Sequence, residues 1–170
     1  MTPLLWSSPR ARLIVHGIGR TDLHFRFLGS RPKDVEAMLR IFDLHSLESH
    51  VRLGGYQRRI PEILAGCTIG CIPTTGWDSF PLSPLEMQAC GLPVVVSECQ
   101  GLPGTVVDGV TGLVVPSGDE SALAKAILRL VDDSRLRLQM GAAPRRRIET
   151  ELTYETQVAQ LFATVCKVLD

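Results

Sequence analysis

The chain has 170 residues, and its 18 Lys and Arg residues balance its 18 Asp and Glu residues, so the formal net charge is zero. This balance argues against a general nucleic-acid binder or a protein that binds anionic membranes, since both carry a basic surplus. The hydrophobic fraction of 45% and the charged fraction of 21% exclude a disordered chain. No apolar run approaches the roughly 18 residues that a membrane-spanning helix needs. We therefore expect one globular domain over residues 1–170, with no nucleic-acid partner and no transmembrane segment.

Cysteine usage and the first residues of the chain predict a reducing, cytoplasmic location. The five cysteines are Cys67, Cys71, Cys90, Cys99 and Cys166. Their odd number, the lack of a Cys-x-x-Cys pair and a start without a basic n-region are typical of reduced thiols in a protein that is not exported. Cys67 and Cys71 have no nearby His to complete a zinc site, so we expect buried side chains there and no bound metal.

Predicted strands and helices alternate along the chain. Apolar and β-branched runs predict strands at residues 24–28, 51–53, 69–72, 94–96 and 112–115. Helical periodicity predicts helices at 32–44, 60–65, 84–90, 103–107 (a short turn), 119–131, 134–143 and 155–169. This β-α alternation predicts an α/β fold with a parallel sheet. Such sheets bind ligands outside the carboxyl ends of their strands.

The first twenty residues allow two interpretations. Residues 12–15 are compatible with a strand that leads into a Gly-x-Gly phosphate loop at 17–19. The apolar positions 13, 14, 17 and 18 also fit one face of a helix. A single Gly-x-Gly is weak evidence, so the helix is the favoured interpretation.

Two carboxylates, Asp78 and Glu86, flank a Pro-containing loop that leads into the predicted helix at 84–90. Ser83 is a good N-cap, and Pro84 is a preferred first helical residue. A helix start carries about half a positive charge and binds phosphate. Glu86, in the first turn, can then bind both hydroxyls of a ribose whose phosphates lie on the helix end. Asp78 is placed to anchor a sugar or to fix the loop.

A purely structural interpretation of the same segment stays open. It is a capped helix after a Pro-rich loop, in which Glu86 only complements the helix dipole. The spacing of the two carboxylates does not separate the alternatives.

From about His24 to its end, the chain carries several motifs in one order. They are Phe27-Leu28-Gly29-Ser30, residues 51–56, residues 60–65, Ile72-Pro73-Thr74, residues 78–95, Gly101-Leu102-Pro103 and residues 108–116. With this series of motifs, the chain resembles the C-terminal, donor-binding domain of the family-4 retaining glycosyltransferases (glycosyl transferases group 1). The implied fold is a Rossmann-like parallel sheet with flanking helices, the C-terminal half of a two-domain B-type glycosyltransferase fold.

The resemblance also implies a role for each matching residue. Glu86 matches the glutamate that binds the nucleotide ribose, and Asp78 matches the acid at the transferred sugar, so both are the candidate catalytic residues. The implied substrate-binding residues are Gly29, Ser30, Gly54, Gly55, Tyr56, Ser79, Phe80, Pro81, Leu82 and Ser83. The implied reaction transfers a hexosyl group from a nucleotide-diphosphate sugar with retention of configuration. Neither a metal nor another cofactor is normally needed.

Several positions depart from the family pattern. Asp78 stands where Glu is commoner, Gly104 replaces a Glu, and Pro81 replaces a Gly and has no N–H to donate. Family members open with a strand and a turn whose Arg and Lys bind the diphosphate, whereas the first lysine here is Lys33. We therefore expect a domain that lacks its first strand and the N-terminal acceptor domain, and whose chain alone is weakly active or inactive. The alternative is a non-catalytic module that binds nucleotide-sugars or a partner chain.

The C-terminal region predicts further contacts. Val158, Leu161, Phe162, Val165 and Leu169 form a helical stripe. In the family the last helix crosses back to the N-terminal domain. We expect part of the stripe to be exposed and to support self-association or binding of a separate acceptor-domain chain.

Two features precede that stripe. Pro144 should break or kink the helix before it. For the run at residues 145–147, a solvated helical face is favoured over contact with acidic lipid headgroups, which would place the protein at the membrane periphery.

Overall fold

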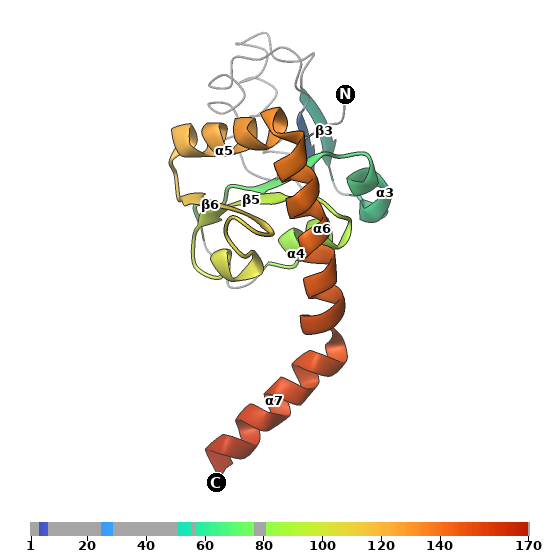
Figure 1. The fold of residues 1–170 in the computed structure, drawn as a ribbon, viewed down its shortest axis with the longest axis vertical. Coiled ribbons are helices and arrows are strands. Elements are labelled where there is room, and N and C mark those ends of the chain that lie inside the picture. The colour runs from blue at the N-terminus through green and yellow to red at the C-terminus, as the bar shows by residue number, and fades with distance from the viewer. Residues whose placement is uncertain (1–3, 7–24, 29–50, 56, 77–80, 170) are drawn as a thin grey trace.

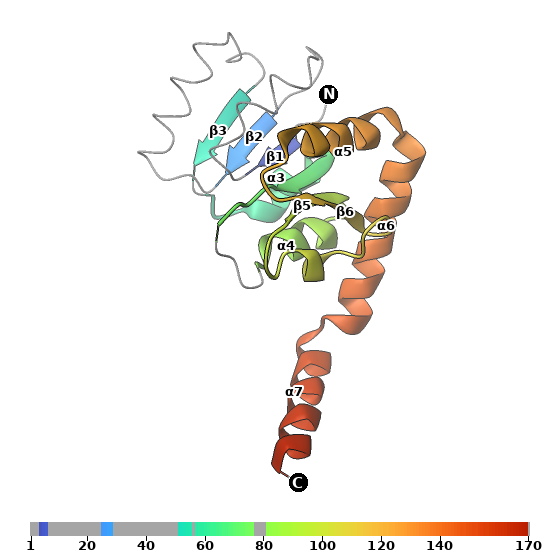
Figure 2. The same cartoon turned by 90° about the vertical axis from the view of Figure 1, so that its left-hand side faces the viewer.

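The computed structural model describes residues 4–6, 25–28, 51–55, 57–76 and 81–169. Within these ranges, six parallel strands form one sheet in the order β3-β2-β1-β4-β5-β6 (Figure 2). The strands are β1 (Leu4–Trp6), β2 (Phe25–Leu28), β3 (Val51–Gly55), β4 (Ile69–Ile72), β5 (Val94–Glu98) and β6 (Gly112–Pro116). The order reverses between β1 and β4, as in doubly wound α/β folds. The predicted Rossmann-like parallel sheet is confirmed.

Helices cover both faces of the sheet (Figure 1). They are α3 (Ile60–Ala65), α4 (Ser83–Ala89), the 3₁₀ helix η2 (Pro103–Thr105), α5 (Glu120–Asp132), α6 (Ser134–Glu151) and α7 (Tyr154–Leu169). Side chains alternate along the strands, so Val95 packs with Leu123 and Ile127 of α5. Val94 and Val96 pack on the other face, with Leu64 of α3 and Met87 of α4. All three valines are fully buried, as expected for a strand covered on both faces.

Most of the predicted elements are confirmed within one to three residues. The strand expected at 94–96 runs from Val94 to Glu98, and the helix expected at 119–131 runs from Glu120 to Asp132. Asp119 caps that helix, because its carboxylate accepts a hydrogen bond from the N–H of Ala122 at 2.8 Å. The helix predicted at 32–44 and the two interpretations of residues 12–19 lie outside the described residues.

The expectation that the sheet lacks its first strand is wrong. Residues Leu4–Trp6 form a strand that pairs in parallel with both β2 and β4. The apolar cluster of three residues is too short to show a strand period. Its partners, Phe25 and Ile69, are distant in the sequence, so only the assembled sheet reveals it.

The C-terminal helices differ from the prediction at Pro144. We expected a break or a kink, and no break occurs, since α6 continues from Ser134 through Pro144 to Glu151. A proline inside a helix removes one backbone hydrogen bond, and here Pro144 is buried against the domain. Among the described residues, no helix combines the length and apolar character that crossing a membrane requires.

A close backbone contact joins α6 to the turn after α4. A Cβ atom on Gly141 of α6 would overlap the carbonyl oxygen of Gly91. Gly91 itself has a φ of 79°, in the left-handed region that favours glycine. Two glycines therefore let α6 pack directly on the end of α4.

We predict that Gly141→Ala lowers the free energy of unfolding by about 1–3 kcal/mol, because the added methyl meets backbone rather than a movable side chain. The matched control is Gly66→Ala, whose Cβ would make only an ordinary contact, 3.5 Å from the carbonyl oxygen of Ile63. Urea unfolding followed by circular dichroism measures both variants. Equal stabilities of the two variants would contradict the prediction.

Candidate functional site

The connection from β4 to α4 starts at the topological switch point of the sheet. β4 ends at Ile72, and the described chain continues as Pro73–Gly76 and then as Pro81–Leu82, which lead into α4. The strand order reverses next to β4, and open α/β sheets bind ligands outside the carboxyl ends of their strands at such a point. The described parts of this connection are therefore positioned at the ligand-binding edge.

The start of α4 lies one residue earlier than the sequence predicts. Leu82, not Ser83, is the N-cap residue, and its carbonyl accepts a hydrogen bond from the N–H of Glu86 at 2.9 Å. Leu82 makes no side-chain capping bond, so the expected hydroxyl cap from Ser83 is wrong. Ser83 instead begins the helix itself. Glu86 still belongs to the first turn.

The Glu86 carboxylate is on the solvent side of α4. Pro84, Met87 and Gln88 are the buried residues of this helix, whereas Glu86 is exposed. The N-terminal end is open as well, because Leu82 is 66% exposed. The helix therefore presents a carboxylate, not covered by other described residues, one turn from its N-terminus.

Two contacts hold α4 in this position. Met87 lies over Gly70 of β4, where a Cβ atom would come within 2.6 Å of its sulfur. The buried amide of Gln88 donates hydrogen bonds to the carbonyl oxygens of Pro84 at 3.1 Å and Thr105 at 2.8 Å. α4 is thereby fixed both to the sheet and to η2.

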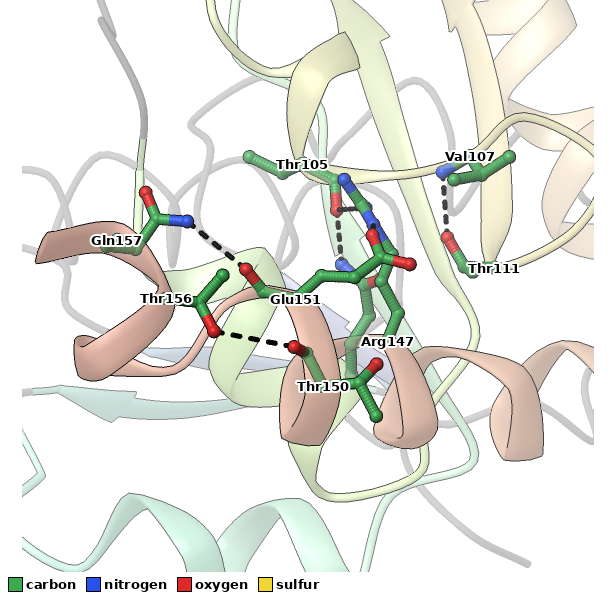
Figure 3. Close-up of polar contacts among 9 residues, drawn as sticks. Thr105, Val107, Thr111, Arg147, Thr150, Glu151, Thr156 and Gln157 are labelled. Carbon is green, nitrogen blue, oxygen red and sulfur yellow. Dashed lines mark hydrogen bonds and ion pairs between the residues drawn. The ribbon is translucent and has the colours of Figure 1, made fainter. Parts of the chain in front are cut away.

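The carbonyl of Thr105 also binds α6. Nη1 of Arg147 donates to this oxygen at 3.3 Å, and Nε of Arg147 forms an ion pair with Glu151 at 3.4 Å (Figure 3). The side chain of Arg147 is only 22% exposed. The solvated face expected for residues 145–147 is therefore wrong for Arg147, which is directed into the domain.

The other predicted site residues divide into three groups. Pro81, Leu82 and Ser83 lie with Glu86 at the start of α4. Gly54 and Gly55 end β3, three strands away from β4, which corresponds to about 14 Å at a spacing of ~4.8 Å per strand. A single ligand contacts both the end of β3 and the start of α4 only if it lies extended along the edge of the sheet. Gly29, Ser30, Tyr56, Asp78, Ser79 and Phe80 lie outside the described residues.

A small hollow of about 20 Å³ on the same edge was not expected from the sequence. It is lined from the ends of β4, β5 and β6 and from the start of α5, and Thr75, Ser97 and Asp119 are among its lining residues. Ser97 directly follows three consecutive valines, and this position at the end of a predicted strand is the sequence signal that could have located it at the edge.

The cysteines show neither a disulfide nor a metal-binding arrangement. All five lie within the described residues, and none forms a disulfide. Cys67 and Cys71 are buried, as predicted. Burial raises the pKa of the Cys71 thiol, which keeps it protonated and unreactive. In the part of the chain that the structure describes, no three His, Cys, Asp or Glu side chains are grouped to hold a metal ion.

Comparison with known proteins identifies the family of this chain. The family described as "Glycosyl transferases group 1" matches residues 7–133. This chain belongs to that family. The match covers β2 to α5 and thus includes the described edge of the sheet.

Individual group 1 proteins are similar over most of the chain. A GDP-mannose-dependent monoacylated alpha-(1-6)-phosphatidylinositol monomannoside mannosyltransferase of Corynebacterium glutamicum is 34% identical over 161 residues, which cover 91% of this chain and 39% of that protein. Anabaena HepE, solved in complex with UDP, superposes with a TM-score of 0.84 at 19% identity and covers 96% of this chain and 49% of that one. The latter likeness concerns the fold alone.

The group 1 chain described here matches the C-terminal half of two-domain relatives. The C-terminal domain of a group 1 protein, LpcC of Francisella tularensis, superposes with a TM-score of 0.79 at 16% identity and is itself covered over 87% of its length. The chain thus spans about two fifths of the Corynebacterium relative and about half of the Anabaena structure.

Proposed function

We propose that this chain is the donor-binding domain of a retaining hexosyltransferase, which holds a nucleotide-diphosphate sugar at the carboxyl edge of its sheet. The main support is the exposed Glu86 carboxylate in the first turn of α4, directly after the connection that starts at the switch point. Membership of the group 1 family supports the same function.

Within this proposal, Glu86 accepts hydrogen bonds from the two hydroxyls of the nucleotide ribose. The diphosphate lies beside the start of α4, where Pro84 has no N–H and the N–H of Glu86 is already bonded to Leu82. The backbone N–H groups of Ser83 and Leu85 remain as helical donors, since the first N–H groups of a helix have no intrahelical partner. Asp78 binds the transferred sugar, as the resemblance of residues 78–95 implies.

The proposed reaction breaks the bond between the anomeric carbon and the diphosphate, and the bonding electrons leave with the diphosphate. The acceptor hydroxyl attacks from the same face, and a leaving phosphate oxygen takes its proton, so the configuration is retained. Backbone N–H groups near the diphosphate stabilise the charge that develops on it. No step needs a metal.

The relatives do not agree on one nucleotide, so they do not identify the nucleotide or the sugar of the donor. The Corynebacterium protein is named for GDP-mannose, whereas the Anabaena structure holds UDP. A binding screen with UDP- and GDP-sugars identifies the donor directly. The cytoplasmic location and the less favoured contact with a membrane surface stay predictions.

We predict that Glu86→Ala weakens donor binding about tenfold or more, because hydrogen bonds to a charged group contribute about 1.5–3 kcal/mol each and ~1.4 kcal/mol corresponds to a factor of ten. The matched control is Glu155→Ala, which removes an exposed carboxylate from α7, far from the edge. Calorimetric titration with UDP, GDP and their sugars measures the dissociation constants. If Glu86→Ala and Glu155→Ala bind the donor equally, the assigned role of Glu86 is wrong.

We predict that the chain alone transfers sugar on the order of 10²–10³-fold more slowly than a two-domain relative. The acceptor-binding groups of such relatives belong to their other half, and the Arg and Lys that bind the leaving diphosphate at the start of the donor domain in the family have no match here. The measurement is transfer of glucose, mannose or N-acetylglucosamine from the donor panel. Rapid turnover by the pure chain would contradict this expectation, whereas donor binding without transfer agrees with it.

The apolar stripe on α7 supports a further part of the proposal. α7 extends away from the sheet and its covering helices (Figure 1, Figure 2). Leu161, Phe162 and Val165 are 63%, 67% and 46% exposed, while Val158 is half-buried. The side chain of Leu169 lies outside the described residues. We propose that this stripe contacts an acceptor-binding half, and a second copy of the chain when that half is absent.

We predict that the chain self-associates at high concentration and that Leu161→Glu shifts it towards the monomer, because a charge cannot be buried in the apolar contact. The control Ala163→Glu places the same charge at another exposed position on α7, outside the stripe. Light scattering over a concentration series measures the mass. A wild-type chain that stays monomeric at every concentration speaks against the self-association.

A further inference from the structure

Gln88, in the second turn of α4, is a polar side chain inside the core. It is 1% exposed, and its amide nitrogen donates hydrogen bonds to the carbonyl oxygens of Pro84 at 3.1 Å and Thr105 at 2.8 Å. Because both neighbours are acceptors, the nitrogen end of the amide has to face them. The other end, Oε1, is buried and has no hydrogen-bond partner among the described residues. Burying an amide oxygen in this way costs stability, so packing alone would favour an apolar side chain at this position.

The carbonyl oxygen of Thr105 is the point at which α4 and α6 are joined. It accepts the hydrogen bond from Gln88 of α4 and a second one, at 3.3 Å, from Nη1 of Arg147 of α6 (Figure 3). A carbonyl oxygen has two lone pairs, so it can serve both donors. The donors lie 17 and 42 positions away from Thr105 in the sequence. Two helices that are distant along the chain therefore share one acceptor.

Thr105 is itself held in place by its own turn. It is fully buried in η2, and its hydroxyl and its N–H both donate to the carbonyl oxygen of Leu102, at 2.6 Å and 3.0 Å. Leu102 is fully buried as well. The oxygen that binds Gln88 and Arg147 is thus a fixed acceptor inside the core.

α4 depends on such support from outside the helix. It has only seven residues, and its N-cap residue, Leu82, makes no side-chain capping bond. A helix this short has little stability of its own, so tertiary contacts set its direction. Successive helical residues are rotated by about 100°, which places Gln88 and Glu86 about 200° apart around the axis. Gln88 therefore anchors the buried side of the same short helix whose exposed side carries Glu86.

We propose that Gln88 and Arg147 are positioning residues for recognition of the nucleotide. Arg147 ties the carbonyl of Thr105 to α6, and Gln88 ties α4 to that carbonyl. Together they set the direction of α4 and so determine how well the carboxylate of Glu86 meets the ribose hydroxyls. Both side chains are directed into the domain and act through α4 rather than on the donor itself. This inference rests on the proposed function, because it assumes that Glu86 binds the ribose.

Gln88→Met separates positioning from stability. Methionine has nearly the volume of glutamine, but its flexible thioether donates no hydrogen bond. The change removes the buried amide oxygen without a described partner, and the Thr105 carbonyl keeps Arg147 as a donor. We expect an unchanged or higher urea midpoint of unfolding, together with about three- to tenfold weaker nucleotide binding, the factor to which one hydrogen bond corresponds. A purely structural role of Gln88 would lower the midpoint and leave the binding unchanged.

Arg147→Met tests the second donor, and α6 offers a matched control. Arg137, near the start of the same helix, also donates from its guanidinium to backbone carbonyl oxygens, those of Leu130 and Val131 of α5, at 2.6 Å and 2.9 Å. Arg137→Met therefore removes hydrogen bonds of the same kind, but at the end of α5. We expect about threefold weaker nucleotide binding in Arg147→Met and wild-type binding in Arg137→Met.

The test is calorimetric titration of the full chain and its variants with UDP and GDP, with urea unfolding of each variant in parallel. A double variant shows whether Gln88 acts through Glu86. When Glu86 has already been changed to Ala, Gln88→Met should cause no further loss of affinity, because the carboxylate that it positions is absent.

The outcomes distinguish the positioning role from the donor site. Wild-type affinity in Gln88→Met or in Arg147→Met overturns the role of that residue. The same loss for Gln88→Met with and without Glu86, or an equal loss in Arg137→Met, overturns positioning through α4 while the donor site stands. A wild-type chain that binds neither UDP nor GDP, or a Glu86→Ala variant that binds them as the wild type does, overturns the proposed role of Glu86, and the positioning role with it.

Discussion

The contact between Met87 and Gly70 determines which way the functional helix faces. Gly70 has no side chain, so Met87 packs onto β4, and this buried contact sets the rotation of α4 about its own axis. Successive residues of an α-helix are rotated by about 100°. With Pro84, Met87 and Gln88 all directed inward, Glu86 has to point to the solvent at the open end of the helix. The exposed carboxylate is therefore a consequence of core packing and not of a local preference of Glu86.

The parallel sheet supplies the second half of the site. Because its strands run the same way, the segments after β4, β5 and β6 leave from one edge, and Thr74, Ser97 and Ser117 come within hydrogen-bonding distance. The valine strand β5 is buried on both faces, so it acts as a fixed support for Thr74, to which Ser97 donates a hydrogen bond. Binding residues of α/β folds commonly lie on loops that a rigid sheet positions in this way.

The C-terminal helices belong to the domain to different degrees. α6 packs along it through Gly141 and Arg147, which reach the backbone of Gly91 and Thr105. α7 leaves the domain and keeps Leu161, Phe162 and Val165 exposed (Figure 1). An apolar stripe without a described partner agrees with a chain that spans only part of the length of its relatives.

The amino-acid sequence by itself determined the alternation of strands and helices and the parallel sheet, because local periodicity encodes these features. It also singled out Asp78 and Glu86 as candidates, through motifs that resemble those of the family. Its apolar runs located β4, β5 and β6 to within two residues at either end. Only the tertiary structure revealed β1 at Leu4–Trp6, the uninterrupted α6 through Pro144, and the bond from Ser97 to Thr74. Each of these depends on partners far away along the chain or on burial against other elements. A local sequence pattern does not indicate these contacts, because they form only when folding brings distant parts of the chain together.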